Sequence, residues 1–397
     1  MTTGCMHLVC ACVLSLASAS ALGHAATRGR ALGAHRAPLQ RRVRAAASAV
    51  GPEILAACDD DKDPRTSGLA RVLRTTEALW NFTRPHTLIG SALCIPALHL
   101  FAAPVGVALP WARLATSISF VMIPSLFINI YITGLNQVLD IEADKINKPY
   151  LPLAKGEFTK NQGIAICVVC LILGLGIGFS APAQLTSMPL RATLLGSTVL
   201  GTAYSLPPLR LKRFPLMAGI CITTVRGALV NWGFFSHATT AVFDLGQPGA
   251  SDAFRAAAAF RCACATSFFL LFGVVIALLK DIPDVAGDRA VGISTFSLQF
   301  GREKVFAVAT GVLQFAFAAV GLGLGGAALR AVAQGGSAAL VGALPRLLGG
   351  VLALSFAAAV RVLARSVKVE VPDEVYAFYM KCWGLFYASY AWLPLAR

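Results

Sequence analysis

An amide and two carboxylates recur at four-residue intervals near the end of one long apolar segment, as Asn136, Asp140 and Asp144. If the segment is helical, each interval overshoots a full turn by about 40°, so the three side chains share one stripe. Ionisable groups beside hydrocarbon cost roughly 2.5–3.5 kcal/mol each and usually belong to a functional site. The alternative is that the helix has already ended and the acids are simply solvated.

A second acidic cluster follows a later apolar segment, in the sequence KDIPDVAGD that begins at Lys280. Its carboxylates, Asp281, Asp284 and Asp288, favour one helical stripe, although Pro283 would bend that helix or begin a new one. Hard oxygen donors suit Mg²⁺, which commonly takes one or two carboxylates together with substrate phosphate. We therefore predict that the two clusters bind Mg²⁺.

A basic segment, YSLPPLRLKR from Tyr204, lies between the two acidic clusters along the chain. Alone, its cationic side chains would be interpreted as a membrane anchor on the cytoplasmic side. Beside two acidic clusters they favour binding of an anionic leaving group, so the three segments predict a site for a diphosphate ester with a hydrocarbon tail. The bases assigned to the diphosphate are Arg84, Lys145, Lys148, Arg210, Lys212 and Arg213.

The elements that must position these side chains are membrane-spanning helices. Of 397 residues, 56% are hydrophobic and 13% charged, and mean hydropathy is +0.69, which is typical of a protein with many spans. We therefore predict an all-α, polytopic membrane bundle. Nine segments have the length and apolar character of a span: roughly 87–104, 114–139, 162–182, 190–206, 214–236, 256–279, 305–329, 338–360 and 375–395.

Some residues within these segments need a separate interpretation. Arg226 interrupts the fifth segment, so either it pairs with a carboxylate inside the bundle or the span is misplaced. The seventh and eighth segments are rich in Gly and Ala, which favours close helix packing. The tryptophans are interpreted mainly as residues of the membrane interface: Trp80, Trp111, Trp232, Trp383 and Trp392.

Nine spans would place the segment before the first span and those after even-numbered spans on one face. Most lysines and arginines outside the spans fall there, so the positive-inside rule makes this face cytoplasmic in type, which in a plastid is the stroma. Both acidic clusters and the basic segment lie on it. We expect an active site at this membrane face.

The first fifty residues have a distinct composition, with six arginines, many Ala and Ser, and no acid before Glu53. This composition is typical of a plastid or mitochondrial transit peptide. A secretory signal is the alternative because residues 8–22 are apolar, but no positive charge precedes them. We predict a plastid transit peptide over residues 1–50, a polar linker over 51–79 and a transmembrane domain over 80–397.

Composition and cysteine spacing argue against two other chemistries. The net charge of +15 comes from bases spread thinly between apolar runs, which form no nucleic-acid module. Cys167 and Cys170 form a CxxC inside an apolar run without a second pair nearby, so we interpret them as small buried hydrophobic residues.

The polar segments resemble the UbiA superfamily of intramembrane aromatic prenyltransferases. Within it the chain is most similar to the homogentisate phytyltransferases of tocopherol biosynthesis, although solanesyltransferases share much of the first motif. Lys155 and the Gly/Ala-rich tract 321–350 depart from the pattern. The resemblance runs from about residue 80 to the C-terminus, and the segments RPHT, NQVLDIEADKINKPYLP, GTAYS and KDIPDVAGD carry it, beginning at Arg84, Asn136, Gly201 and Lys280.

The resemblance implies transfer of a phytyl group from phytyl diphosphate to homogentisate with decarboxylation, giving 2-methyl-6-phytylbenzoquinol. Tyr204 would stabilise the allylic cation or contact the diphosphate, and the bases named above would stabilise the leaving group. The partners are the two substrates and membrane lipid; the sequence does not predict an oligomeric state. The Mg²⁺ ligands would be Asn136, Asp140, Asp144, Asp281, Asp284 and Asp288, of which Asp140, Asp144, Asp284 and Asp288 are expected to be catalytic.

Two alternatives stay open. Geranylgeranyl or solanesyl diphosphate could be the donor, because tail selection depends on the shape of a cavity rather than on motifs. A membrane transporter would also carry intramembrane carboxylates, but it predicts sites near the midplane, whereas these clusters follow the ends of spans.

Overall fold

The computed structural model describes residues 74–245 and 251–396. The chain divides into two compact units, Met1–Trp80 and Asn81–Arg397. The described part of the first unit, residues 74–80, is helical, so the end of the segment predicted as a linker is helix. The predicted transit peptide and the rest of the predicted linker lie outside the described residues.

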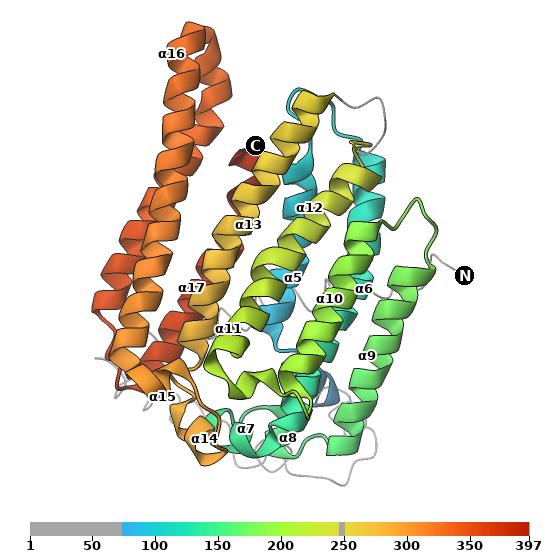
Figure 1. Ribbon diagram of the computed structural model, residues 1–397, viewed down its shortest axis with the longest axis vertical. Coiled ribbons are helices and arrows are strands. Elements are labelled where there is room, and N and C mark those ends of the chain that lie inside the picture. The colour runs from blue at the N-terminus through green and yellow to red at the C-terminus, as the bar shows by residue number, and fades with distance from the viewer. Residues whose placement is uncertain (1–73, 246–250, 397) are drawn as a thin grey trace, which may run out of the picture. The chain divides into compact units, whose positions relative to one another are not determined.

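The second unit is a bundle of long helices (Figure 1), and no strand occurs in residues 81–245 or 251–396. The all-α prediction is confirmed. A π-helical stretch, η3 (Thr224–Leu229), joins two helices into one helical path. The long helices are α5 (Pro85–Ala102), α6 (Trp111–Leu139), α9 (Lys160–Ser180), α10 (Met188–Ser205), α11 (Pro215–Thr223), α12 (Val230–Ala241), α13 (Asp252–Lys280), α16 (Arg302–Arg365) and α17 (Pro372–Trp392).

Short helices connect the long ones, mostly at one end of the bundle (Figure 1). They lie between long helices, except η4, which follows α17 directly. They are α7 (Ile141–Asn147), α8 (Pro152–Lys155), η2 (Leu211–Arg213), α14 (Val285–Ala290), α15 (Phe296–Phe300) and η4 (Leu393–Ala396).

Six stretches of the described chain are long and apolar enough to cross a membrane. Each of the nine predicted spans coincides with a helix or a helical path, but α10, the α11–η3–α12 path and α17 do not meet that measure. The predicted count of nine is therefore not confirmed. The six stretches are Pro85–Ala102, Trp111–Leu139, Lys160–Ser180, Asp252–Lys280, Arg302–Gly335 and Leu340–Arg365.

Helix α16 turns back on itself and contributes two of these stretches (Figure 1). Its two arms meet at Gly321 and Gly350, where a Cβ added to Gly350 would lie 2.9 Å from the carbonyl oxygen of Gly321. Only glycine fits such a close approach of two backbones. The prediction that small residues allow close packing in this region is confirmed.

Local sequence sets where several helices begin. Thr159 and Gln162 form a reciprocal capping box at the start of α9, and the Ser187 hydroxyl accepts from the Leu190 amide at the start of α10. Pro85 and Pro215 occupy first turns, where the missing amide hydrogen costs nothing. These signals fix the helix ends between which the polar segments lie.

The two acidic stripes are both interrupted. Helix α6 ends at Leu139 and α7 begins at Ile141, with Asp140 between them at φ −118° and ψ 21°, so the prediction of one continuous helix through Asp144 was wrong. Aspartate favours such breaks because its side chain competes for nearby backbone groups. The turn that holds Pro283 separates α13 from α14, which is the new start that this proline suggested.

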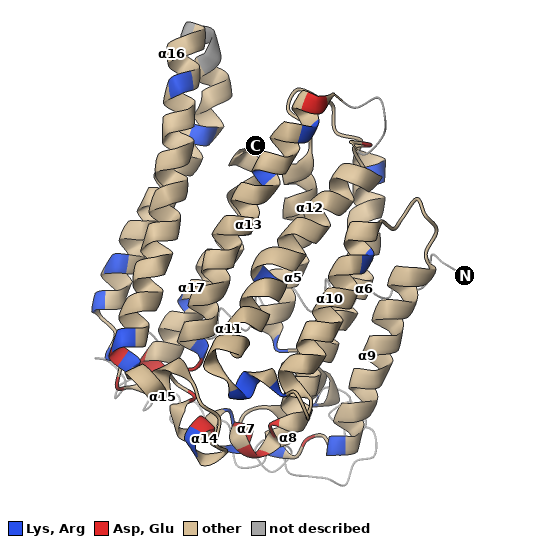
Figure 2. Ribbon diagram, in the orientation of Figure 1, with Lys and Arg blue, Asp and Glu red and all other residues tan. Residues whose placement is uncertain are grey.

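Charge is concentrated at the end of the bundle that carries α7, α8, α14 and α15. Figure 2 shows acidic and basic residues around these short helices, and mostly uncharged helix between them and the other end. Both acidic clusters and the basic segment therefore meet at one end of the bundle, as predicted. The structure does not show on which side of a membrane that end lies.

Candidate active site

Asn147, the last residue of α7, ties the two acidic segments together. Its side-chain amide donates to the Asp284 carbonyl at 3.0 Å, and its side-chain oxygen accepts from the Gly287 amide at 2.9 Å. A Cβ on Gly287 would lie 2.5 Å from the Asn147 amide group, so glycine is needed where the segments touch. This clamp holds the α13–α14 turn against α7.

Replacing Asn147 with Ala is expected to raise the KM for the diphosphate ester that the sequence predicts as substrate about tenfold. The Asp284 carbonyl and the Gly287 amide would both lose their partner, at about 1–3 kcal/mol for a buried polar group, and the acidic segments would separate. Initial rates at varied diphosphate concentration measure this. Asn161→Ala, at an exposed asparagine in α9, is the matched control and should leave the KM unchanged; equal values for both variants would contradict the clamp.

Asp140 accepts from the two bases of the segment that follows α10. Lys212 donates to one carboxylate oxygen, and Arg210 donates to the other at 3.3 Å. Lys212 is 5% exposed and Asp140 10%, so this pair is largely shielded from solvent. Burial lowers the pKa of Lys212, and the charge of Asp140 opposes that change.

Asp144 faces Arg84, which precedes α5. A guanidinium nitrogen of Arg84 lies 3.7 Å from Asp144 Oδ2, which is too far for a hydrogen bond, and that buried oxygen has no other hydrogen-bond partner among the described residues. Burial raises the pKa of Asp144, and the charges of Arg84 and Lys148 oppose the rise. One oxygen of this carboxylate is therefore available to a cation.

Arg84 and Arg210 both occupy the left-handed region of backbone conformation, at φ 51° and φ 37°. Residues with a long side chain adopt this region only when their surroundings impose it, and such positions cluster at functional sites. Here it occurs at the two arginines whose guanidinium groups reach the acids of the first cluster.

The second cluster is held by two lysines. Lys148, from the segment after α7, donates to Asp284, and Lys280 donates to Asp281 at 2.5 Å. Lys280 also donates to the Tyr204 hydroxyl at 3.3 Å, which brings the end of α10 to this cluster. Tyr204 thus contacts the site through Lys280.

Asp288 lies in α14 and is 9% exposed. Burial, followed by the negative charges of Asp281 and Asp284, raises the pKa of Asp288 to about 7. The basic side chains around this cluster therefore do not balance the negative charge that its three carboxylates would carry if all were ionised.

Most of the predicted site residues come together in this arrangement, but three of them make other contacts or are exposed. Asn136 donates to the Ser205 hydroxyl at a long 3.4 Å, Lys145 pairs with Glu142 at 2.8 Å, and Arg213 is exposed on η2. The residues brought together are Arg84, Asp140, Asp144, Lys148, Tyr204, Arg210, Lys212, Asp281, Asp284 and Asp288.

Sequence reasoning did not assign Lys280 or Asn147 to the site. Both stand inside the acidic segments, but only Lys280 offered a signal in the sequence. Lys280 directly precedes Asp281, and a base adjoining an acidic cluster is a natural partner for it. Asn147 gave no comparable signal, because its partners are some 140 positions further along the chain.

The donor set fits a hard divalent cation that also takes oxygens from its substrate. The described residues contain no group of three or more His, Cys, Asp or Glu side chains placed to hold a metal ion alone. A cation such as Mg²⁺ does not need one, because it commonly uses one or two carboxylates and phosphate. The free oxygen of Asp144 and the crowded negative charge at Asp288 are the observations that favour this fit.

Two interpretations of residues inside the bundle change. Among the described residues no carboxylate pairs with Arg226; its guanidinium carbon instead lies 4.9 Å from the centre of the Trp383 ring. Trp383 and Trp392 are 1% and 7% exposed, so they are core residues and not interface residues. Cys167 and Cys170 are buried free cysteines, as predicted.

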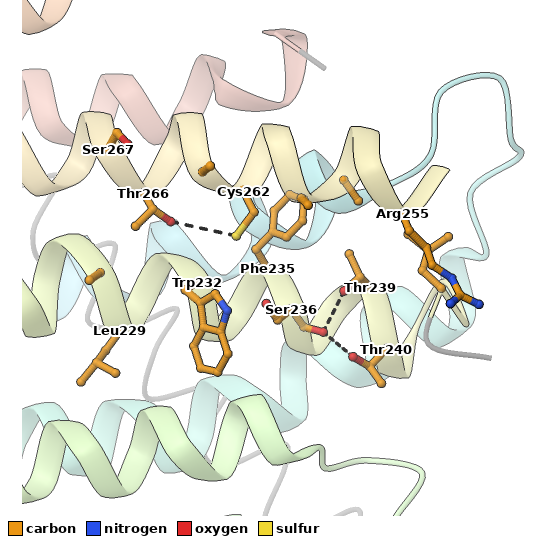
Figure 3. A pocket seen from close by; sticks show the side chains of 15 residues that line it. Leu229, Trp232, Phe235, Ser236, Thr239, Thr240, Arg255, Cys262, Thr266 and Ser267 are labelled. Atoms are coloured by element: carbon orange, nitrogen blue, oxygen red, sulfur yellow. Dashed lines mark hydrogen bonds between the residues drawn. The ribbon is translucent and has the colours of Figure 1, made fainter. Parts of the chain in front are cut away.

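A cavity of about 790 Å³ lies elsewhere, between α12 and α13 (Figure 3). Apolar, serine and threonine side chains line it, with Arg255 near the start of α13 and Trp232 from α12. Roughly 40 Å of helix separates Arg255 from the acids that follow α13. The cavity is therefore not part of the acidic site.

Comparison with known proteins gives a consistent result. The model of the "UbiA prenyltransferase family" matches residues 92–385. The chain is 37% identical over 358 residues to homogentisate phytyltransferase 1 of Arabidopsis thaliana, covering 90% of this chain and 82% of that protein. It is 36% identical to the homogentisate geranylgeranyltransferase of Triticum aestivum, covering 82% and 74%. The fold matches a UbiA homolog from Archaeoglobus fulgidus bound to DMAPP and Mg²⁺, with a TM-score of 0.50 at 15% identity, covering 79% of this chain and 98% of that one.

Proposed function

Because the chain belongs to the UbiA prenyltransferase family, we propose that it transfers a phytyl group from phytyl diphosphate to homogentisate. The product would be 2-methyl-6-phytylbenzoquinol, on the route to tocopherols. The observation that carries the proposal is the meeting of two acidic segments and a basic segment at one end of an apolar helical bundle. That arrangement suits a substrate with an anionic head and a hydrocarbon tail.

The bases of the site bind the diphosphate. Arg84, Lys148, Arg210 and Lys212 are already held at the acids, so their charges are in place before substrate arrives. They stabilise the negative charge that develops on the diphosphate as the allylic carbon–oxygen bond breaks. Lys145 and Arg213 stay predictions for the same role, as exposed bases in the neighbouring α7 and η2.

The carboxylates serve a divalent cation. We propose Mg²⁺, held by oxygens of Asp140, Asp144, Asp284 and Asp288, with Asn136 and Asp281 as further predicted ligands; when bound, it supplies Lewis-acid stabilisation of the leaving diphosphate. A fold neighbour supports this choice, since the Archaeoglobus homolog was solved with Mg²⁺. Tyr204 positions Lys280 beside the second cluster and offers its ring to the allylic cation.

The proposed reaction balances without an oxidant or reductant. The bond between the allylic carbon and the diphosphate oxygen breaks, and a bond forms from that carbon to a ring carbon of homogentisate. The ring carbon loses a proton, the carboxylate leaves as CO₂, and the methylene carbon takes a proton to become a methyl group. The surrounding apolar helices enclose the phytyl chain and keep water from the cation.

We propose a plastid membrane as the location, with the acidic end toward the stroma. The presequence composition, the distribution of bases and the chloroplastic names of relatives support this placement. The position of the acids at the end of the bundle disfavours the transporter alternative, which needs a site near the midplane.

The test supplies membranes containing the full chain with homogentisate and each of three donors: phytyl, geranylgeranyl and solanesyl diphosphate, with Mg²⁺ or with EDTA. We expect the highest kcat/KM with phytyl diphosphate and loss of transfer in EDTA. Preference for geranylgeranyl or solanesyl diphosphate would overturn the donor but not the reaction. Absence of transfer with all three donors would overturn the proposed function.

A further inference from the structure

Arg226 is a cation inside the helical bundle that the chemistry above does not use. It stands in η3, midway along the α11–η3–α12 path, and is only partly accessible. Among the described residues no Asp or Glu lies within ion-pair distance of it. A guanidinium in such surroundings is costly unless an anion accompanies it at some stage of function.

The local structure fixes Arg226 firmly. Asn231 donates to the carbonyls of Arg226 and Gly227, both at 2.9 Å, and Tyr390 in turn donates to Asn231 at 2.9 Å. These bonds satisfy carbonyls in the π-helical stretch, a type of irregularity that is frequent at functional sites. A Cβ on Gly227 would lie 2.4 Å from the Leu270 Cα, so glycine lets η3 rest directly on α13.

Trp383 of α17 packs against the Arg226 guanidinium, and two further rings, from α5 and α17, pack against Trp383. The guanidinium carbon lies 4.9 Å from the Trp383 ring centre, and the His86 and Tyr387 rings lie 5.2 Å and 5.9 Å from that ring. The Tyr387 hydroxyl donates to the His86 carbonyl at 2.7 Å, which joins the two helices. Trp383 is buried, whereas His86, Tyr387 and Arg226 keep accessible surface. The accessible groups are thus a cation and two flat rings, which together suit a planar anionic ligand.

This aromatic cluster adjoins the acidic site. His86 follows two residues after Arg84, whose guanidinium faces Asp144. On α17, Tyr376 is two turns before Trp383, and its hydroxyl lies 3.3 Å from that of Tyr150, in the segment that follows α7. A ligand held at Arg226 would therefore lie deeper in the bundle than the diphosphate and next to it.

We propose that Arg226 binds the carboxylate of the aromatic acceptor, and that His86 and Tyr387, which pack on the buried Trp383, form the wall against which the acceptor ring packs. The inference rests on the proposed function, because it assigns residues to the acceptor of that reaction. A neutral prenyl tail would gain nothing from a guanidinium, whereas an arylacetate supplies the missing anion. The acceptor ring would then stand between Arg226 and the diphosphate end, where the allylic carbon is released.

The first test is kinetic and compares Arg226→Gln with Arg261→Gln. Arg261 is the comparison because its guanidinium also lies over a ring, 5.8 Å from Phe101, and it has a structural role there, donating to the Phe101 and Ala103 carbonyls at 3.1 Å and 2.9 Å. For Arg226→Gln we expect the KM for homogentisate to rise about tenfold or more, because one charge-assisted contact is lost. The KM for the prenyl diphosphate should stay within about twofold of its value in the unsubstituted chain. Arg226→Lys should recover part of the loss. Equal changes in both KM values would show a structural role and overturn the assignment.

The second test needs no turnover. Equilibrium dialysis of homogentisate and of its neutral methyl ester against purified protein should show at least about tenfold tighter binding of the acid, and Arg226→Gln should bind both alike. If transfer proceeds but Arg226→Gln keeps the preference for the acid, the inference fails and the proposed function stands. If no donor supports transfer yet the preference depends on Arg226, the proposed function fails, and Arg226 is a carboxylate-binding residue without an assigned reaction.

Discussion

Replacing Asp140 with Asn is expected to reduce prenyl transfer on the order of a thousandfold, mainly through kcat. The substitution removes the negative charge that holds Lys212 and Arg210 and that, in the proposed mechanism, binds the divalent cation, so charge stabilisation of the leaving diphosphate would be lost. Asparagine keeps the shape of the side chain and an oxygen for Lys212. The measurement is product formation at saturating substrates, with Mg²⁺ varied over a wide range.

The control for Asp140→Asn must separate chemistry from folding. Lys212 is 5% exposed, and a buried charge that loses its partner can cost about 3–5 kcal/mol of stability. Thermal inactivation of the purified variant reports that cost independently of rate. Asp252→Asn, at an exposed acid at the start of α13, should change neither quantity. Folded Asp140→Asn protein that transfers prenyl groups within tenfold of the unsubstituted rate would contradict the assignment.

The helices and the identity of the acids could be predicted because both depend on local sequence. Long apolar segments must become helices in a membrane, since every backbone polar group needs an internal partner there. Asp140, Asp144 and the second cluster stood out because charge is rare beside such segments. The break at Asp140 was not predicted, because a four-residue period continues unchanged through a single non-helical residue.

The pairings could not be predicted, because they join segments that are far apart in the sequence. Lys145 is adjacent to Asp144 in the chain, yet it turns to Glu142 one helical turn earlier. Lys148, three residues later, instead reaches Asp284 across the site. Which of two neighbouring lysines faces the acids depends on where α7 ends, and element ends are the least reliable part of sequence-based prediction.

Arg226 was singled out by the sequence, but its contact was not predicted. The sequence identified it as costly and suggested a carboxylate partner or a misplaced span. Among the described residues no carboxylate pairs with it; α17 instead places Trp383 against the guanidinium, and the π-helical stretch joins α11 and α12 into one helical path. An arginine over a ring has no sequence signature, since any of the aromatic residues of the chain could have supplied the ring.

The ion pairs suggest how the site could bind a charged substrate at a low desolvation cost. Each of the acids Asp140, Asp144 and Asp284 faces a base in the described structure. In the proposed reaction a bound diphosphate would draw the bases toward its own oxygens, and the carboxylates of Asp140, Asp144 and Asp284 would then be available to hold a divalent cation. Partners are exchanged with little change in the net charge buried, which limits the desolvation cost of binding.

Replacing Asp284 with Asn should lower prenyl transfer by a similar factor, on the order of a thousandfold, because Asp284 pairs with Lys148 as Asp140 pairs with Lys212. If the two acidic segments form one site, either loss disables the same unit. The rate of the Asp140→Asn, Asp284→Asn double variant should then lie within about tenfold of the rate of the slower single variant, as is found for groups that act together. Rates of the four proteins at saturating Mg²⁺ measure this. Losses that multiply to about a millionfold would show two independent sites, and the Asn147 contacts between the segments argue against that outcome.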